Sequence, residues 1–166
     1  MIPANKQSRA NFSVNSVSIS NPYGVKYYVA IAEYNEKDIS PTILKRYISY
    51  MLQYRRIAEV DTEEEAEYIV YVKYIGFSSN PDRQILEINA FSRRVLDAIG
   101  EQATPSWKAT TIHNGRLRNK DKLLAMMSFS IRGILGGNIN PYEKNQFISP
   151  NSEQVMEIYS IVEPKT

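Results

Sequence analysis

The sequence predicts an α+β domain, a mostly antiparallel sheet of five to six strands with two helices packed on one face. Two stretches repeat apolar residues at helical spacing. Several shorter stretches are rich in β-branched and aromatic residues, as expected of strands. In chain order they give β-β-α-β-β-β-α-β. Tyrosine, with 12 copies, suits a sheet with one wet face because its ring is apolar and its hydroxyl is polar.

The chain is expected to form a single domain, residues 12–163, behind a flexible polar arm, residues 1–11. A chain of 166 residues is long enough for one ordinary domain with its own core. The first strand is expected at residues 12–19. Its alternation of apolar residues breaks between Val14 and Val17, which favours a bulge or an edge position.

Capping residues place the first helix at about residues 40–54. Ser40 is suited to cap the first backbone N–H groups, and Pro41 fits the first helical position. An apolar stripe follows, formed by Ile43, Leu44, Tyr47, Ile48, Met51 and Leu52. The basic residues off this stripe are Lys45, Arg46, Arg55 and Arg56. They form either an anion-binding face or an ordinary solvated helix face.

Further strands are expected at residues 25–34, 57–60, 68–75, 84–96 and 107–113. The glutamates of residues 62–67 are interpreted as a solvated loop or strand entry, because consecutive glutamates do not converge on one metal ion. Residues 76–83 are expected to be a loop.

The C-terminal third is expected to hold the second helix and the last strand. The helix should run from about Asn119 to Leu135 and stop at Gly136 and Gly137, because glycine readily adopts the left-handed conformation. Residues 138–152 are predicted as a loop, and residues 155–162 as a strand.

Composition excludes several kinds of chemistry. Cysteine is absent, which excludes disulfides, thiolate nucleophiles and iron–sulfur clusters. The single histidine, His113, excludes a multi-histidine metal site. It lies at a predicted strand end, where a surface position is a better interpretation than a general base. No catalytic or phosphate-loop motif is present, so neither an enzyme nor a cofactor is expected.

Two features are candidates for an interaction surface. Arg116, Arg118, Lys120 and Lys122 form a local basic patch, which is either a set of phosphate contacts or a solvated loop that enters the second helix. Trp107 is either an exposed anchor, since tryptophan is common at binding hot spots, or a core residue of its strand.

Two segments together resemble the small bacterial envelope lipoproteins of the DUF4136-like group. Residues 66–76 (AEYIVYVKYIG) resemble a segment of that group in which Ala-Asp precedes an alternating apolar strand, although this chain has Glu67 in place of the Asp. Residues 105–115 are similar to the strand of that group that begins Pro-x-Trp. The resemblance spans about residues 25–162. It implies an exported, lipid-anchored α+β domain and no known catalytic residues.

The leading hypothesis is therefore a non-enzymatic domain of the bacterial cell envelope, periplasmic and lipid-anchored in its full-length form. It would bind another envelope protein through an exposed sheet face or an edge strand, and a homodimer through such an edge stays open. The alternative is a cytoplasmic nucleic-acid-binding module, which would use the basic patch and tyrosine stacking. Nucleic acid is the less favoured partner, because the formal net charge is only +2.

Overall fold

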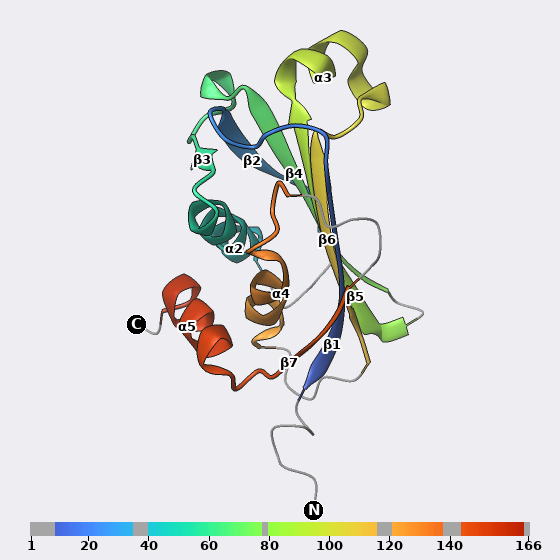
Figure 1. Ribbon diagram of the computed structural model, residues 1–166, viewed down its shortest axis with the longest axis vertical. Helices are drawn as coiled ribbons and strands as arrows, with labels where there is room; N and C mark the ends of the chain where they lie inside the picture. Colours follow the sequence, from blue (N-terminus) through green and yellow to red (C-terminus); the bar gives the residue numbers. More distant parts are fainter. Residues whose placement is uncertain (1–8, 35–39, 78–79, 116–120, 138–143, 165–166) are drawn as a thin grey trace, which may run out of the picture.

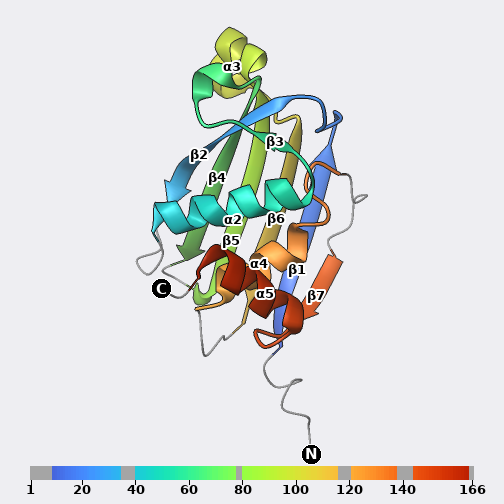
Figure 2. The same ribbon diagram turned by 90° about the vertical axis from the view of Figure 1, so that its left-hand side faces the viewer.

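A computed structural model describes residues 9–34, 40–77, 80–115, 121–137 and 144–164. They form a seven-stranded sheet in the order β3-β2-β4-β5-β6-β1-β7, with helices on one face (Figures 1 and 2). Strand β2 runs parallel to β3 and β4, and the other neighbours are antiparallel. The α+β class and the mostly antiparallel sheet are confirmed. The seven strands and four helices exceed the predicted numbers.

The strands are β1 (Ala10–Ser18), β2 (Lys26–Tyr34), β3 (Ala58–Glu59), β4 (Tyr68–Phe77), β5 (Asn80–Ser92), β6 (Trp107–Asn114) and β7 (Lys144–Ile148). The helices are α2 (Pro41–Tyr54), α3 (Arg93–Ile99), α4 (Leu123–Ile131) and α5 (Glu153–Val162). Short 3-10 turns follow β3 at Glu63–Glu65 and α3 at Gly100–Gln102. The predicted strands at residues 25–34, 57–60, 68–75 and 107–113 are thus confirmed.

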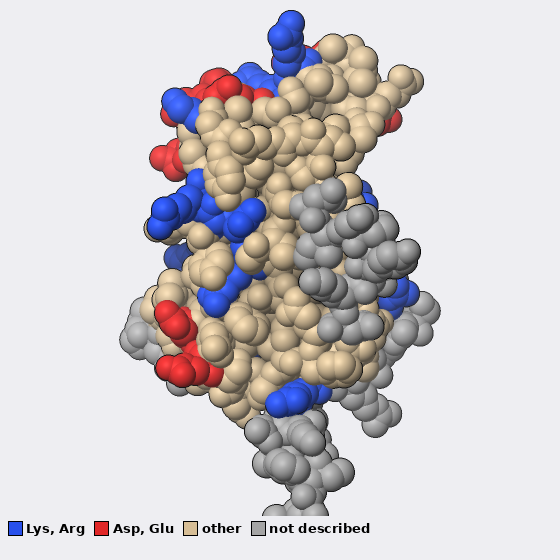
Figure 3. Space-filling model, viewed as in Figure 1, with Lys and Arg blue, Asp and Glu red and all other residues tan. Residues whose placement is uncertain are grey.

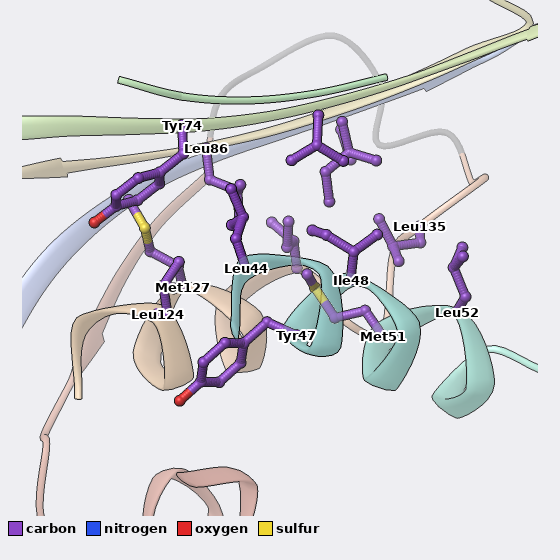
Figure 4. Packing of buried hydrophobic residues seen from close by; sticks show 14 of the residues in the cluster. Leu44, Tyr47, Ile48, Met51, Leu52, Tyr74, Leu86, Leu124, Met127 and Leu135 are labelled. Carbon is purple, nitrogen blue, oxygen red and sulfur yellow. The ribbon is translucent and has the colours of Figure 1, made fainter. Parts of the chain in front are cut away.

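Helix α2 forms as its sequence predicts. The Ser40 hydroxyl accepts a hydrogen bond from the Ile43 N–H at 3.1 Å, and Pro41 occupies the first turn. The apolar stripe of α2 is buried against the sheet, beside α4 (Figure 4). In that view Tyr74 and Leu86 of the sheet point toward the helices. An aliphatic side chain that is fully buried between the helices and the sheet, such as Leu86, stabilises the fold by roughly 1.5–3 kcal/mol.

The bulge or edge position predicted for the first strand is wrong. Strand β1 begins at Ala10, within the predicted arm, and lies between β6 and β7 without a register shift. The inward position between Val14 and Val17 is occupied by Ser16, which is fully buried. Its hydroxyl lies 2.9 Å from the Ile134 carbonyl oxygen and 2.7 Å from that of Gly137. Hydrogen bonding therefore permits a polar residue at a core position.

The strand predicted at residues 84–96 is wrong at both ends. It begins earlier, because β4 continues to Phe77 and β5 begins at Asn80, within the segment predicted as a loop at residues 76–83. It ends at Ser92, whose hydroxyl accepts a hydrogen bond from the Val95 N–H and caps α3. A serine at the end of a strand was a cap signal that the alternating pattern concealed.

The C-terminal third differs most from the prediction. The second helix is shorter than Asn119–Leu135, because α4 spans only Leu123–Ile131, with Lys122 as its N-cap. Part of the predicted loop 138–152 is strand β7, paired with β1. The predicted last strand is helix α5, capped by Ser152 and buried through Val155, Ile158 and Val162.

Candidate functional site

Trp107 is a core residue, which confirms the core alternative and rules out an exposed anchor as part of an interaction surface. Only 1% of its surface is exposed. Its ring nitrogen donates a hydrogen bond to the Tyr27 hydroxyl at 3.2 Å. Burial raises the pKa of Tyr27 to about 12, because the charged phenolate would be poorly solvated there. The Trp107 indole thus anchors β6 to β2 and presents nothing to a partner.

His113 is also buried, so the surface position predicted for it is wrong. It lies on the inner face of β6, with its Nδ1 atom 3.0 Å from the amide oxygen of Gln84 on β5. Its ring centroid lies 5.3 Å from that of Phe12. The contacts of His113 place it in the core, where it joins three neighbouring strands.

The predicted basic patch lies mostly outside the described residues. This applies to Arg116, Arg118 and Lys120. Lys122 is half-buried at the start of α4, with its ammonium nitrogen 6.0 Å from the ring centroid of Tyr159 on α5. A phosphate contact by this patch therefore stays a prediction.

No described helix covers the second face of the sheet, which we call the outer face (Figure 1). A hollow of about 290 Å³ lies on it, lined by Ser13, Asn15, Val17, Lys108, Thr110 and Ile112. Lys108 forms an ion pair with Glu87 at 2.9 Å. Burial opposes ionisation of Glu87, but hydrogen bonds from Asn89 and Lys108 outweigh it and lower the Glu87 pKa. Lys73 on β4, which lies opposite Glu87, adds a second positive charge that lowers the same pKa.

Three exposed apolar side chains lie along β1 and β7 without forming one patch, because Phe147 pairs opposite Asn11 near the start of β1 whereas Val17 pairs opposite Lys108 near its end. Val17, Ile19 and Phe147 have exposed fractions of 49%, 76% and 65%. Val17 and Phe147 lie on β1 and β7, and Ile19 follows β1 directly. We call these three residues the apolar edge. Phe147 was missed in the sequence because the segment that holds it has no alternating pattern.

A second surface feature is built where α2 and α4 end. Arg132, at the end of α4, donates a hydrogen bond to the Tyr50 hydroxyl on α2 at 2.6 Å, and its guanidinium lies 4.3 Å from the Tyr54 ring centroid. Arg55, at the end of α2, donates through Nε to the Leu135 carbonyl beyond α4 at 2.9 Å. The arginine at the end of each helix thus contacts the other helix or the segment that follows it.

Arg55, Arg56 and Arg132 are called here the arginine cluster. Lys and Arg side chains gather over α2 and α4 in the face shown in Figure 3. An open groove of about 670 Å³ runs along α2 beside the cluster. It is lined by Thr42, Lys45, Arg46, Ser49, Tyr50, Gln53, Glu59, Val60, Asp61, Ile161, Val162 and Pro164. The anion-binding interpretation of α2 named Arg55 and Arg56 but missed Arg132, which lies far away in the sequence.

The described residues contain neither a cluster of metal ligands nor a membrane-spanning helix. No three or more His, Asp or Glu side chains in this part of the chain come together as a metal site would require. None of the helices in these segments has both the length and the hydrophobicity needed to cross a bilayer.

Comparison with known proteins finds solved structures of similar fold. No family model and no curated protein matches the chain. A solved structure of the PelC dodecamer from Paraburkholderia phytofirmans has a TM-score of 0.50 at 14% identity, covering 75% of this chain and 95% of that chain. A dodecamer of a PelC variant with one substitution has a TM-score of 0.51 at 16% identity, covering 74% and 95%. At these identities the chain is similar to PelC in fold.

Proposed function

We propose that this chain is a non-enzymatic binding domain of the bacterial cell envelope that works as a homo-oligomer. The observation that carries the proposal is the last strand of the sheet, β7, on which the side chain of Phe147 is 65% exposed. An edge strand presents unpaired N–H and C=O groups, which serve as a template for another chain. Exposed apolar side chains beside such an edge favour burial against a partner.

The fold shared with PelC supports a second copy of this chain as that partner, because both PelC structures are dodecamers. If copies of this chain assembled head to tail into a closed ring, each would offer two different surfaces to its two neighbours. The sheet has two unlike edges, β7 on one side and the short β3 beside β2 on the other. Strand β3 pairs with β2 only at Lys26 and Tyr27.

The envelope location is supported by the resemblance of residues 66–76 and 105–115 to lipoproteins of the DUF4136-like group. We expect the full-length protein to be lipid-anchored and to contact another envelope protein. A leader that ends in a lipid-bearing cysteine, read upstream of Met1 in the native gene, would agree with this. A start codon at Met1 without such a leader would contradict it and favour the nucleic-acid alternative.

Assembly is tested by the mass of the chain in solution, measured by light scattering. The wild type should give a multiple of the 19.0 kDa chain. Phe147→Asp places a charge on the apolar edge and should yield a monomer. The control is Ile99→Asp, which changes another exposed apolar residue, on α3, and should leave the mass unchanged. A wild-type monomer at every concentration would refute the proposal.

A further inference from the structure

The arginine cluster holds positive charge that the described part of the protein does not neutralise. Within these residues, no carboxylate lies within ion-pair distance of Arg55, Arg56 or Arg132. Two of the arginines lie at the C-terminal ends of α2 and α4, where helix dipoles favour cations. Each helix end is equivalent to only about half a negative charge. Two ends offset about one of the three charges, which leaves about +2 on the arginines before Glu59, which lines a hollow together with Arg56, is counted.

Two of the three guanidinium groups are fixed in place, and most of their donors have no acceptor within the described part of the chain. A guanidinium has about five N–H donors. Arg132 uses one of them on Tyr50, and Arg55 uses one on Leu135. The ring of Tyr54 further fixes Arg132 by a cation–π contact. Because both side chains are already ordered, a ligand would lose little entropy in ordering them.

The backbone of Arg56 places its side chain at the C-terminal end of α2, next to Arg55. Its φ angle is +60°, and among the described residues it is the one non-glycine with a positive φ. Glycine is the usual residue in this conformation, because a side chain there is strained. Here the Arg56 N–H donates to the Gln53 carbonyl and the Ile57 N–H to the Leu52 carbonyl, the usual hydrogen bonds of a helix C-terminus, so the positive φ closes α2. In this position the arginine contributes an exposed charge directly beside Arg55.

We propose that the arginine cluster binds a phosphomonoester group, carried on a hydroxyl-rich molecule that lies in the groove along α2. A phosphomonoester carries a charge of about −1.5 to −2 at pH 7 and offers three acceptor oxygens. These values match the charge and the donor supply of the cluster better than a single carboxylate does. Tyr50 connects the arginine cluster with the groove, because its hydroxyl accepts a hydrogen bond from Arg132 and its side chain lines the groove.

The groove indicates the rest of the ligand. Its lining includes the uncharged polar side chains of Thr42, Ser49 and Gln53, and two cations and two carboxylates as well: Lys45, Arg46, Glu59 and Asp61. Such a lining suits hydroxyl groups, as in a sugar or glycerol phosphate, better than it suits an acyl chain. The same phosphate chemistry occurs on soluble sugar phosphates and on lipid headgroups, so the two sources must be separated by experiment.

Binding is tested by calorimetric titration with glucose 6-phosphate, with glucose as the uncharged match, and by sedimentation with phosphatidylcholine vesicles with or without phosphatidate. Binding to glucose 6-phosphate but not to glucose, or to phosphatidate vesicles but not to phosphatidylcholine vesicles, supports the proposal and identifies the source of the phosphate. Binding to neither overturns it. Tighter binding to a single-stranded oligonucleotide, compared at equal phosphate concentration, also overturns it and favours nucleic acid as the ligand.

Variants locate the site. Arg55→Gln and Arg132→Gln should each weaken binding by about tenfold, the expected loss for one charge-assisted hydrogen bond. The control Arg94→Gln removes the same charge from the exposed surface of α3 and should leave the affinity within about twofold, the scale expected of a remote exposed charge. An equal effect of Arg94→Gln overturns the site.

A fourth variant separates binding from folding. Arg56→Gly removes the charge and relieves the backbone strain, so it should raise the melting temperature and weaken phosphate binding together. A general loss of structure cannot produce that combination. If Arg56→Gly binds phosphate as tightly as the wild type does, the role assigned to Arg56 is wrong. Because these tests measure phosphate binding, they are independent of the oligomeric state.

Discussion

At the scale of single residues, the core depends on a few polar atoms that satisfy one another. The Tyr27 hydroxyl is fully buried and accepts from the Trp107 ring nitrogen. The Ser130 hydroxyl lies 2.9 Å from that of Thr111 and 2.6 Å from the Met127 carbonyl oxygen. A buried polar atom that loses its partner destabilises a protein by about 1–3 kcal/mol. These pairs therefore constrain how the helices and strands pack.

Tyr27→Phe should reveal both roles of that hydroxyl. At neutral pH the variant leaves the Trp107 N–H without its acceptor, so the free energy of unfolding should fall by about 1 kcal/mol. The pKa of Tyr27 is about 12 in the fold, against 10.0 for an ordinary tyrosine. Above pH 10 the unfolded chain loses this proton first, so wild-type stability falls as the pH rises toward 12.

The variant lacks this titration, so the two proteins should become about equally stable near pH 11, where the wild type has lost roughly 1.4 kcal/mol. Urea unfolding at pH 7 and pH 11 measures the difference. Tyr47, whose pKa burial also raises, is present in both proteins and cancels in the comparison. A difference that stays constant between the two pH values would contradict this account.

At the scale of elements, the sequence predicts those whose local signals agree. In α2, the Ser40 cap, Pro41 and the apolar stripe all indicate a helix, and the structure has one. In α5 the signals conflict, because Val155–Val162 is apolar enough for either a strand or a helix. The helical spacing of Val155, Ile158 and Val162 and the cap at Ser152 are what the fold uses.

The arginine cluster shows the corresponding limit for a surface site. Arg55 and Arg56 follow the apolar stripe of α2, so the sequence identifies them as basic residues off the buried face. Arg132 joins them only because α4 packs beside α2 on the sheet. Contacts between distant segments depend on tertiary packing, which spacing along one helix does not encode. The burial of Trp107 and His113 likewise depends on which face of β6 the helices cover.

Ser152→Ala tests the assignment of α5 as a capped helix. The Ser152 hydroxyl accepts from the Val155 N–H at 3.3 Å, and loss of such a cap costs about 1 kcal/mol. The matched control is Ser160→Ala, an exposed position within the same helix, which should change stability by less than about 0.5 kcal/mol. Denaturant unfolding compares the two variants. Equal effects would contradict the cap.

At the scale of the whole molecule, the two sides of the sheet differ. Helices α2, α4 and α5 lie on one side (Figure 2), and their buried residues form the core with the inner face of the sheet. The Tyr47 hydroxyl donates to the Glu163 carboxylate and ties α2 to the end of α5. The apolar edge lies away from this layer, on β1 and β7. The arginine cluster lies on the helical layer, so assembly and phosphate binding would use separate surfaces.

Hydrogen–deuterium exchange across a dilution series tests the central claim, that the molecule assembles through the β7 edge. As concentration rises, backbone amides of Lys144–Ile148 should exchange more slowly, because a neighbouring copy covers them. The amides of α5, Glu153–Val162, should not change, and Phe147→Asp should abolish the protection of β7. Exchange in β7 that is independent of concentration, while the measured mass increases, would contradict assembly through this edge.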